Sequence, residues 1–122
     1  MFKIDSENGT IVWENTLPAG GYASPCVGEN IVFMPCGYTQ LSGLSKSTGE
    51  LLWNYDFGSR VRATPKFLSG KEKMALLGTG NKFFGIDESG VIVYKVNLDN
   101  GMLFGEPIVI EDSIYFLGGE SE

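Results

Sequence analysis

Short apolar runs separated by glycine, proline or polar turn residues follow one another along the whole chain. The runs at residues 31–36 and 91–96 are rich in β-branched and aromatic side chains, a composition that is typical of β-strands. No stretch of about a dozen residues places its apolar side chains at the spacing of an amphipathic helix. The pattern therefore predicts an all-β protein.

One motif occurs three times, at residues 4–13, 44–53 and, one residue shorter, 86–94. In each copy an apolar residue and a short polar residue precede a turn glycine, and an apolar run with an aromatic residue follows. The three turn glycines are 40 and 41 residues apart. A period of about forty residues indicates a repeat architecture built from one recurring unit.

Each position of the motif has a physical role in a hairpin. The short polar side chain accepts a hydrogen bond from a backbone N–H two residues on, and the glycine supplies the positive φ that the turn requires. The aromatic ring recurs in phase, so we expect it to pack between neighbouring sheets, where it contributes about 2–3 kcal/mol. These repeat positions are Asp5, Gly9, Trp13, Ser45, Gly49, Trp53, Asp87, Gly90 and Tyr94.

Residues 22–55 and 63–96 each contain four predicted strands, which we expect to form two four-stranded antiparallel sheets. Residues 1–15 contain only the last two strands of such a unit, and residues 106–118 only the first two. Pro25, Pro65 and Pro107 are 40 and 42 residues apart and mark the first strand of each unit, where the missing N–H is tolerated. Residues 1–122 thus read as a β-propeller fragment of about three blades, with one blade split between the termini.

The two split halves need a neighbour, because an unpaired half sheet exposes apolar faces and an open strand edge. Two chains would close a homodimeric ring of about six blades, or the residues are an excerpt of a longer chain. A ring of about three blades closed by one chain is disfavoured, since propellers have about four to eight.

Composition narrows the range of functions. The net charge of −6 argues against a nucleic-acid partner, which requires concentrated Lys and Arg, and no apolar run is long enough to span a membrane. The absence of histidine excludes Ser-His-Asp and Cys-His pairings within the chain. Cys26 and Cys36 are expected to be too far apart to form a disulfide, with Cys26 opposite a residue near Ile31. Unbridged thiols lean towards a cytoplasmic location, and a periplasmic or extracellular one follows if a signal peptide has been lost.

The motif resembles the repeat of pyrroloquinoline-quinone-type β-propellers, which runs roughly Ala-x-Asp-x-x-Thr-Gly-x-x-x-Trp. The copy at residues 44–53 and the glycine before it match best, with Gly43, Ser45, Thr48, Gly49 and Trp53 in those places. The resemblance implies a propeller. It does not carry the dehydrogenase activity of the quinoproteins, because the chain has neither adjacent cysteines nor a cluster of calcium ligands. It points instead to cofactor-free members that serve as binding scaffolds, such as the outer-membrane barrel-assembly lipoprotein.

In such a sheet, the loop before the first strand and the turn between the second and third strands lie on one face. Residues at these places differ between the repeats, as a surface that recognises an asymmetric partner should. The alternative is that they are ordinary solvated loop residues. The candidate partner-binding residues are Tyr22, Ser24, Tyr38, Gln40, Arg60, Arg62, Asn81, Lys82, Phe104 and Glu106.

We therefore expect a non-enzymatic scaffold that binds a protein or peptide through loops on one face, with no cofactor and no metal. The first alternative is a fragment of a quinone-dependent dehydrogenase. The second is a carbohydrate or small-ligand sensor module, in which Tyr22 and Phe104 would be stacking platforms.

Overall fold

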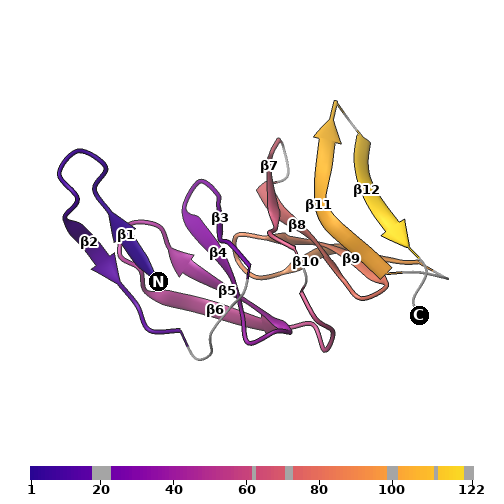
Figure 1. The fold of residues 1–122 in the computed structure, drawn as a ribbon, viewed down its shortest axis with the longest axis horizontal. Coiled ribbons are helices and arrows are strands. Elements are labelled where there is room, and N and C mark those ends of the chain that lie inside the picture. Colours follow the sequence, from indigo (N-terminus) through magenta and orange to yellow (C-terminus); the bar gives the residue numbers. More distant parts are fainter. Residues whose placement is uncertain (18–22, 62, 71–72, 99–101, 112, 120–122) are drawn as a thin grey trace.

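The computed structural model describes residues 1–17, 23–61, 63–70, 73–98, 102–111 and 113–119, and Figure 1 draws the rest in grey. All regular elements in this described part are β-strands, as predicted. In chain order they are β1 (Phe2–Ile4), β2 (Ile11–Glu14), β3 (Cys26–Val27), β4 (Ile31–Cys36), β5 (Gln40–Ser45), β6 (Leu51–Asp56), β7 (Lys66–Ser69), β8 (Lys73–Thr79), β9 (Lys82–Asp87), β10 (Ile92–Asn97), β11 (Met102–Ile110) and β12 (Ser113–Gly119).

These strands form two four-stranded sheets, β3–β6 and β7–β10, and two two-stranded sheets, β1–β2 and β11–β12. Every neighbouring pair is antiparallel and consecutive in the chain. Figure 1 shows the sheets side by side in chain order, with the two small sheets at opposite ends of the molecule. The predicted fold class, four-stranded antiparallel blades with one blade split between the termini, is confirmed.

The first strands of the three units, predicted at residues 22–27, 63–67 and 106–110, begin at other residues, and proline explains these differences. β3 and β7 begin directly after Pro25 and Pro65, because a residue without an N–H cannot extend the ladder further. β11 instead runs through Pro107, and its register with β12 shifts between Phe104 and Ile108. Such an irregularity accommodates a proline within a strand, so β11 begins at Met102 rather than at residue 106.

The pairing of β3 with β4 also differs from expectation, because Cys26 lies opposite Phe33 rather than opposite a residue near Ile31. The Gly28 N–H donates to the Ile31 carbonyl, 2.8 Å away, so the turn is centred between these two residues. Both thiols are unbridged.

Three apolar clusters hold adjacent sheets together. The cluster between β3–β6 and β7–β10 has the buried members Ile31, Phe33, Leu41, Val61, Ala75, Leu77, Phe84 and Ile86. The cluster between β7–β10 and β11–β12 contains Met74, Leu76 and Phe83, with Val109 and Ile114 against them. The cluster between β1–β2 and β3–β6 contains Trp13, Val32 and Leu44.

The motif aromatic of one sheet lies on the turn glycine of the next. The Trp13 indole covers Gly49 and donates its Nε1–H to the Lys46 carbonyl at 3.0 Å. The Trp53 indole covers Gly90 and donates to the Glu88 carbonyl at 2.8 Å. Both glycines have positive φ, 76° and 84°, and a Cβ at either would collide with the ring. The repeat glycine therefore serves the turn and the joint between sheets at once.

Candidate binding surface

The described candidate residues lie in the β4–β5 and β8–β9 turns and in the connections between sheets. We call this the loop rim: residues 23–25, 37–40, 56–61, 63–64 and 80–82. In Figure 1 the β6–β7 connection lies at the bottom of the molecule, whereas the turns of β1–β2, β3–β4 and β11–β12 point to the top. The loop rim and these hairpin turns are therefore opposite edges of the sheets.

At the centre of the loop rim Arg60 stacks on Tyr38. The guanidinium carbon lies 5.4 Å from the centroid of the phenol ring, within the range of a cation–π contact. Tyr38 has a φ of 63°, which is uncommon for a residue with a side chain, and its ring is 53% exposed. The arrangement presents a planar cation and an aromatic ring to solvent together.

Backbone hydrogen bonds fix the loop that carries Arg60. The Val61 N–H donates to the Tyr38 carbonyl at 2.7 Å, and the Phe57 N–H donates to the Thr39 carbonyl at 2.9 Å. Val61 is buried in the core and forms an isolated bridge with Thr79 of the next sheet. The β6–β7 connection is thus attached to both neighbouring sheets, which holds the exposed Arg60–Tyr38 pair in place.

Asp56 adds a carboxylate to the loop rim. Its pKa is lowered, mainly because the Gly58 N–H donates to it at 2.8 Å, and further through the Thr39 and Gln40 side chains. Gln40 also accepts a hydrogen bond from the Asn54 amide at 3.3 Å. The loop rim therefore carries a cation, Arg60 over Tyr38, and a carboxylate, Asp56 at Thr39 and Gln40.

Two other parts of the loop rim use their polar groups locally. The Ser24 N–H donates to the Thr64 hydroxyl at 3.3 Å, which joins the positions before Pro25 and Pro65 of adjacent sheets. The Asn81 backbone carbonyl accepts from the Leu98 N–H at 2.8 Å, and the Asn81 side-chain amide donates to the Leu98 carbonyl at 3.3 Å. Lys82 is half-buried at the start of β9.

The structure brings only some of the predicted residues together. Tyr38 and Arg60 are in contact, and Gln40 lies in the same β4–β5 segment with Asn54 and Asp56 as its partners. Ser24, Asn81 and Lys82 belong to other segments of the loop rim. Tyr22 and Arg62, and the side chains of Phe104 and Glu106, lie outside the described residues. Asp56 was missed by sequence reasoning, although its place at the end of β6 next to a Gly-Ser turn was a signal.

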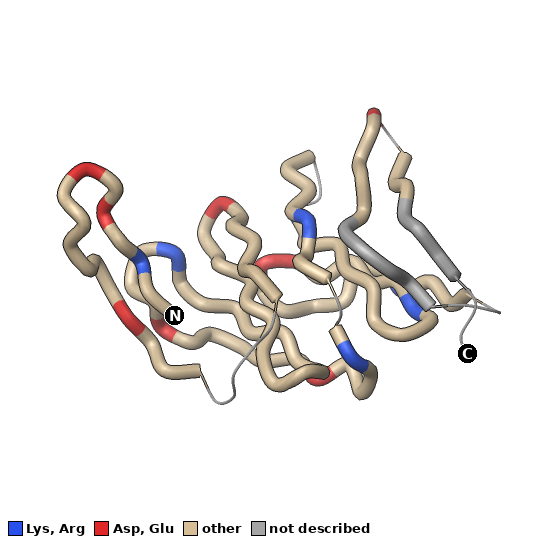
Figure 2. Tube along the Cα trace, viewed as in Figure 1, with Lys and Arg blue, Asp and Glu red and all other residues tan. Residues whose placement is uncertain are grey.

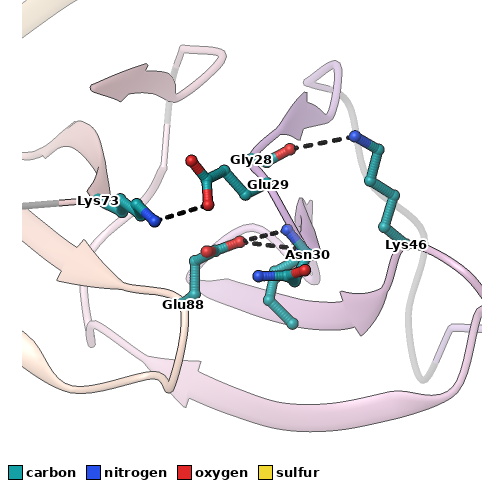
Figure 3. A network of polar contacts seen from close by, with 7 residues as sticks. Gly28, Glu29, Asn30, Lys46, Lys73 and Glu88 are labelled. Atoms are coloured by element: carbon teal, nitrogen blue, oxygen red, sulfur yellow. Dashed lines mark hydrogen bonds and ion pairs between the residues drawn. The ribbon is translucent and has the colours of Figure 1, made fainter. Parts of the chain in front are cut away.

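A second polar group, also missed, joins the sheets on the opposite edge (Figure 3). Glu88 accepts from the N–H groups of Asn30 and Ile31 at 2.8 and 3.0 Å. Lys73 pairs with Glu29 at 2.7 Å, and this pairing raises the Lys73 pKa. Nearby, the Lys46 ammonium donates to the Gly28 carbonyl at 3.5 Å.

The charge distribution offers no concentrated site elsewhere in the described part. Figure 2 shows Lys and Arg dispersed over several segments rather than gathered on one face. No three His, Cys, Asp or Glu residues in the described ranges are grouped to hold a metal ion. Among the same residues no helix is long and apolar enough to cross a membrane.

Comparisons with known proteins agree with this architecture. Residues 2–119 match the family described as outer membrane protein assembly factor BamB. The structure is similar to BamB from Moraxella catarrhalis, with a TM-score of 0.82 and 18% identity over 94% of this chain and 39% of that one. It is also similar to the quinohemoprotein alcohol dehydrogenase ADHIIG from Pseudomonas putida HK5, with a TM-score of 0.69 and 19% identity.

The second likeness covers 89% of this chain and 18% of the dehydrogenase, so the chain spans well under half of either solved structure. No curated protein matches the sequence. Likeness at this level of identity shows the fold, and the family match covers nearly every residue. The chain belongs to the PQQ-like propeller-repeat family that is described as outer membrane protein assembly factor BamB.

Proposed function

We propose that the chain is a non-enzymatic propeller scaffold that binds a protein or peptide through the loop rim. The observation that carries this proposal is the exposed Arg60–Tyr38 pair on a loop whose backbone is fixed by hydrogen bonds at both ends. Arginine and tyrosine are enriched among the residues that dominate binding energy at protein interfaces. A fixed loop also reduces the entropy that is lost on binding.

The family match also supports a protein-binding role. The family is described as an assembly factor for outer membrane proteins, and such a description implies protein partners for its members. The guanidinium favours a carboxylate on the partner, because planar bidentate pairing suits the two groups. Asp56, whose pKa the Gly58 N–H lowers, adds an acceptor for a backbone N–H or a basic side chain of a partner.

The test begins with a phage-displayed library of random peptides panned on the folded chain. We expect enriched peptides to contain an acidic residue, and fluorescence anisotropy then measures the affinity of one selected peptide. Arg60→Ala and Tyr38→Ala should each weaken binding about tenfold or more. Lys95→Ala, an exposed residue on β10, is the matched control. Equal affinity in all four proteins would contradict the proposal.

The dehydrogenase likeness supports a second candidate, a fragment of a quinone-dependent enzyme. Titration of the chain with pyrroloquinoline quinone and calcium separates the two, because tight stoichiometric binding would replace the scaffold proposal. The sensor-module alternative rests on Tyr22 and Phe104. A glycan array on which their alanine variants bind like the wild type would reject it.

A further inference from the structure

A row of polar side chains crosses β4, β5 and β6 and ends at the Asp56 carboxylate of the loop rim. Its centre is the Asn54 amide nitrogen, which donates to the Ser42 hydroxyl at 2.8 Å and to the Gln40 side-chain oxygen at 3.3 Å. The Cys36 sulfur lies 3.2 Å from the Ser42 oxygen. Gln40 lies directly opposite Asp56 in the sheet, and its side chain hydrogen-bonds to the carboxylate. The row thus connects a buried part of the sheet with the loop rim.

The Gln40 amide is turned with its NH2 group toward Asp56. An ionised carboxylate only accepts hydrogen bonds, so the group that bonds to it must be the donor end of the amide. The Gln40 oxygen then lies on the other side, where the Asn54 amide donates to it. The second hydrogen of that amide serves Ser42, with a longer contact of 3.8 Å to the Cys36 sulfur. Asn54 therefore holds the amide of Gln40 in the orientation that suits Asp56.

The repeat itself does not require this row. Counted from the glycine opposite the motif aromatic, the sheet β7–β10 has Phe84 and Lys95 at the positions that Ser42 and Asn54 occupy in β3–β6. Phe84 is buried in the apolar cluster between the two sheets. A buried hydroxyl costs stability unless it is hydrogen-bonded, whereas a buried phenyl ring contributes to it. The polar row is therefore a special feature of β3–β6, and it leads to the loop rim.

The Asp56 carboxylate is oriented by this arrangement but is not neutralised. Its donors are the Gly58 N–H, Thr39 and Gln40, which are all uncharged. In the part of the chain that the structure describes, no Lys or Arg nitrogen lies within ion-pair distance of this carboxylate. An ionised carboxylate has about four acceptor positions, so three donors leave one open. A Lys or Arg side chain is the group of a peptide that best fills such a position, because its hydrogen bond is assisted by charge.

We propose that Asn54 is a positioning residue of the loop rim, which holds Gln40 and Asp56 so that the carboxylate takes a basic side chain of the bound peptide. This inference rests on the proposed function and adds a second anchor of opposite charge to it. Arg60 takes the acidic residue of the peptide, and Asp56 takes a Lys or Arg residue. The partner is therefore a segment that carries both signs of charge rather than a purely acidic one.

The pKa of Asp56 tests the positioning role without any partner. Asn54→Leu has nearly the same size but no donor, and Gln40→Leu removes the link itself. Each should raise the Asp56 pKa in a carbon-detected NMR titration, because the charged form loses a hydrogen bond. If Asn54 acts through Gln40, the double variant should raise the pKa no further than Gln40→Leu alone. Asn97→Leu, at an exposed residue that ends β10, is the matched control and should leave this pKa unchanged.

Peptide selection tests the chemistry of the partner. The random-peptide library is panned in parallel on the wild type and on Asp56→Asn. Peptides from the wild type should carry a Lys or Arg at a constant spacing from the acidic residue, and peptides from Asp56→Asn should keep only the acidic residue. One wild-type peptide should bind Asp56→Asn about threefold more weakly, and Asn54→Leu should change its affinity in the same direction. Replacing the basic residue of the peptide by glutamine should cancel both differences.

The possible failures are distinguishable. An Asp56 pKa that Asn54→Leu leaves unchanged, in a variant whose circular dichroism shows intact strands, would overturn the positioning role. Wild-type peptides that are acidic but share no basic residue would overturn the partner assigned here and leave the proposed function intact. Selection of no peptide by the folded wild-type chain would overturn the proposed function, and this partner with it.

Discussion

The contact between Trp13 and Gly49 gives the sharpest test of how neighbouring sheets are joined. Gly49→Ala adds one methyl group where the indole lies, so the ring must leave its position. The positive φ of 76° costs an alanine about 1 kcal/mol. Displacing a tryptophan that is 8% exposed costs about 2 kcal/mol more in lost burial. We expect Gly49→Ala to lower the free energy of unfolding by about 3 kcal/mol in total.

Gly58→Ala is the matched control for this variant. Gly58 has a φ of 71°, but nothing lies within 4 Å of the added Cβ. This variant should therefore lose only about 1 kcal/mol, the backbone cost alone. Urea unfolding followed by tryptophan fluorescence measures both values, at one fixed protein concentration so that association affects them equally. Equal destabilisation by the two substitutions would refute the idea that the ring on the glycine holds the sheets together.

Three further predictions concern single contacts. Trp53→Phe removes the 2.8 Å hydrogen bond to the Glu88 carbonyl and should lower the free energy of unfolding by about 1–2 kcal/mol, measured by the same urea method. Glu88→Gln weakens the acceptor for two N–H groups of the preceding sheet and should lower the free energy of unfolding by about 1 kcal/mol. The control Glu50→Gln, at an exposed residue, should change this free energy little, and equal losses in the two variants would contradict the prediction. In a carbon-detected NMR titration, the Asp56 pKa should lie below its ordinary value of 3.8. Its contribution to stability is therefore present above pH 3.8 and is lost as the pH falls through the lowered pKa. Thr39→Val should return this pKa only part of the way to the ordinary value, because the Gly58 N–H still donates to the carboxylate.

The strands were predictable because the repeat supplies three independent readings of one pattern. β4 lies at residues 31–36, as predicted from the apolar run, and β5 and β9 end at the short polar residue of the motif, before its turn glycine. The first strand of each unit was the least predictable. There the proline, rather than the apolar pattern, decides where the ladder begins, and β11 shows that a shift in register can overcome even that limit.

The contacts of the candidate site were less predictable, for a different reason. Tyr38 and Arg60 were both candidates, but their stacking depends on the unusual φ of Tyr38 and on the path of the loop that carries Arg60. Glu88 was assigned only to a turn, since nothing local indicates that its carboxylate reaches a sheet 58 residues earlier in the chain. Side-chain contacts between repeats follow from packing, which the spacing of residues along the chain does not encode.

The two edges of the sheets differ in structure, and this difference supports the proposed scaffold role. At the hairpin edge Trp13 and Trp53 make the same contact with the next glycine turn, so this edge repeats one structural solution. At the loop rim the β4–β5 turn carries Tyr38, whereas the equivalent β8–β9 turn carries Asn81 bonded to Leu98. The indole–glycine joints therefore do not use the side chains of Tyr38 and Arg60. If the loop rim binds a partner as proposed, substitutions there would alter binding while the joints at the hairpin edge keep the sheets in register.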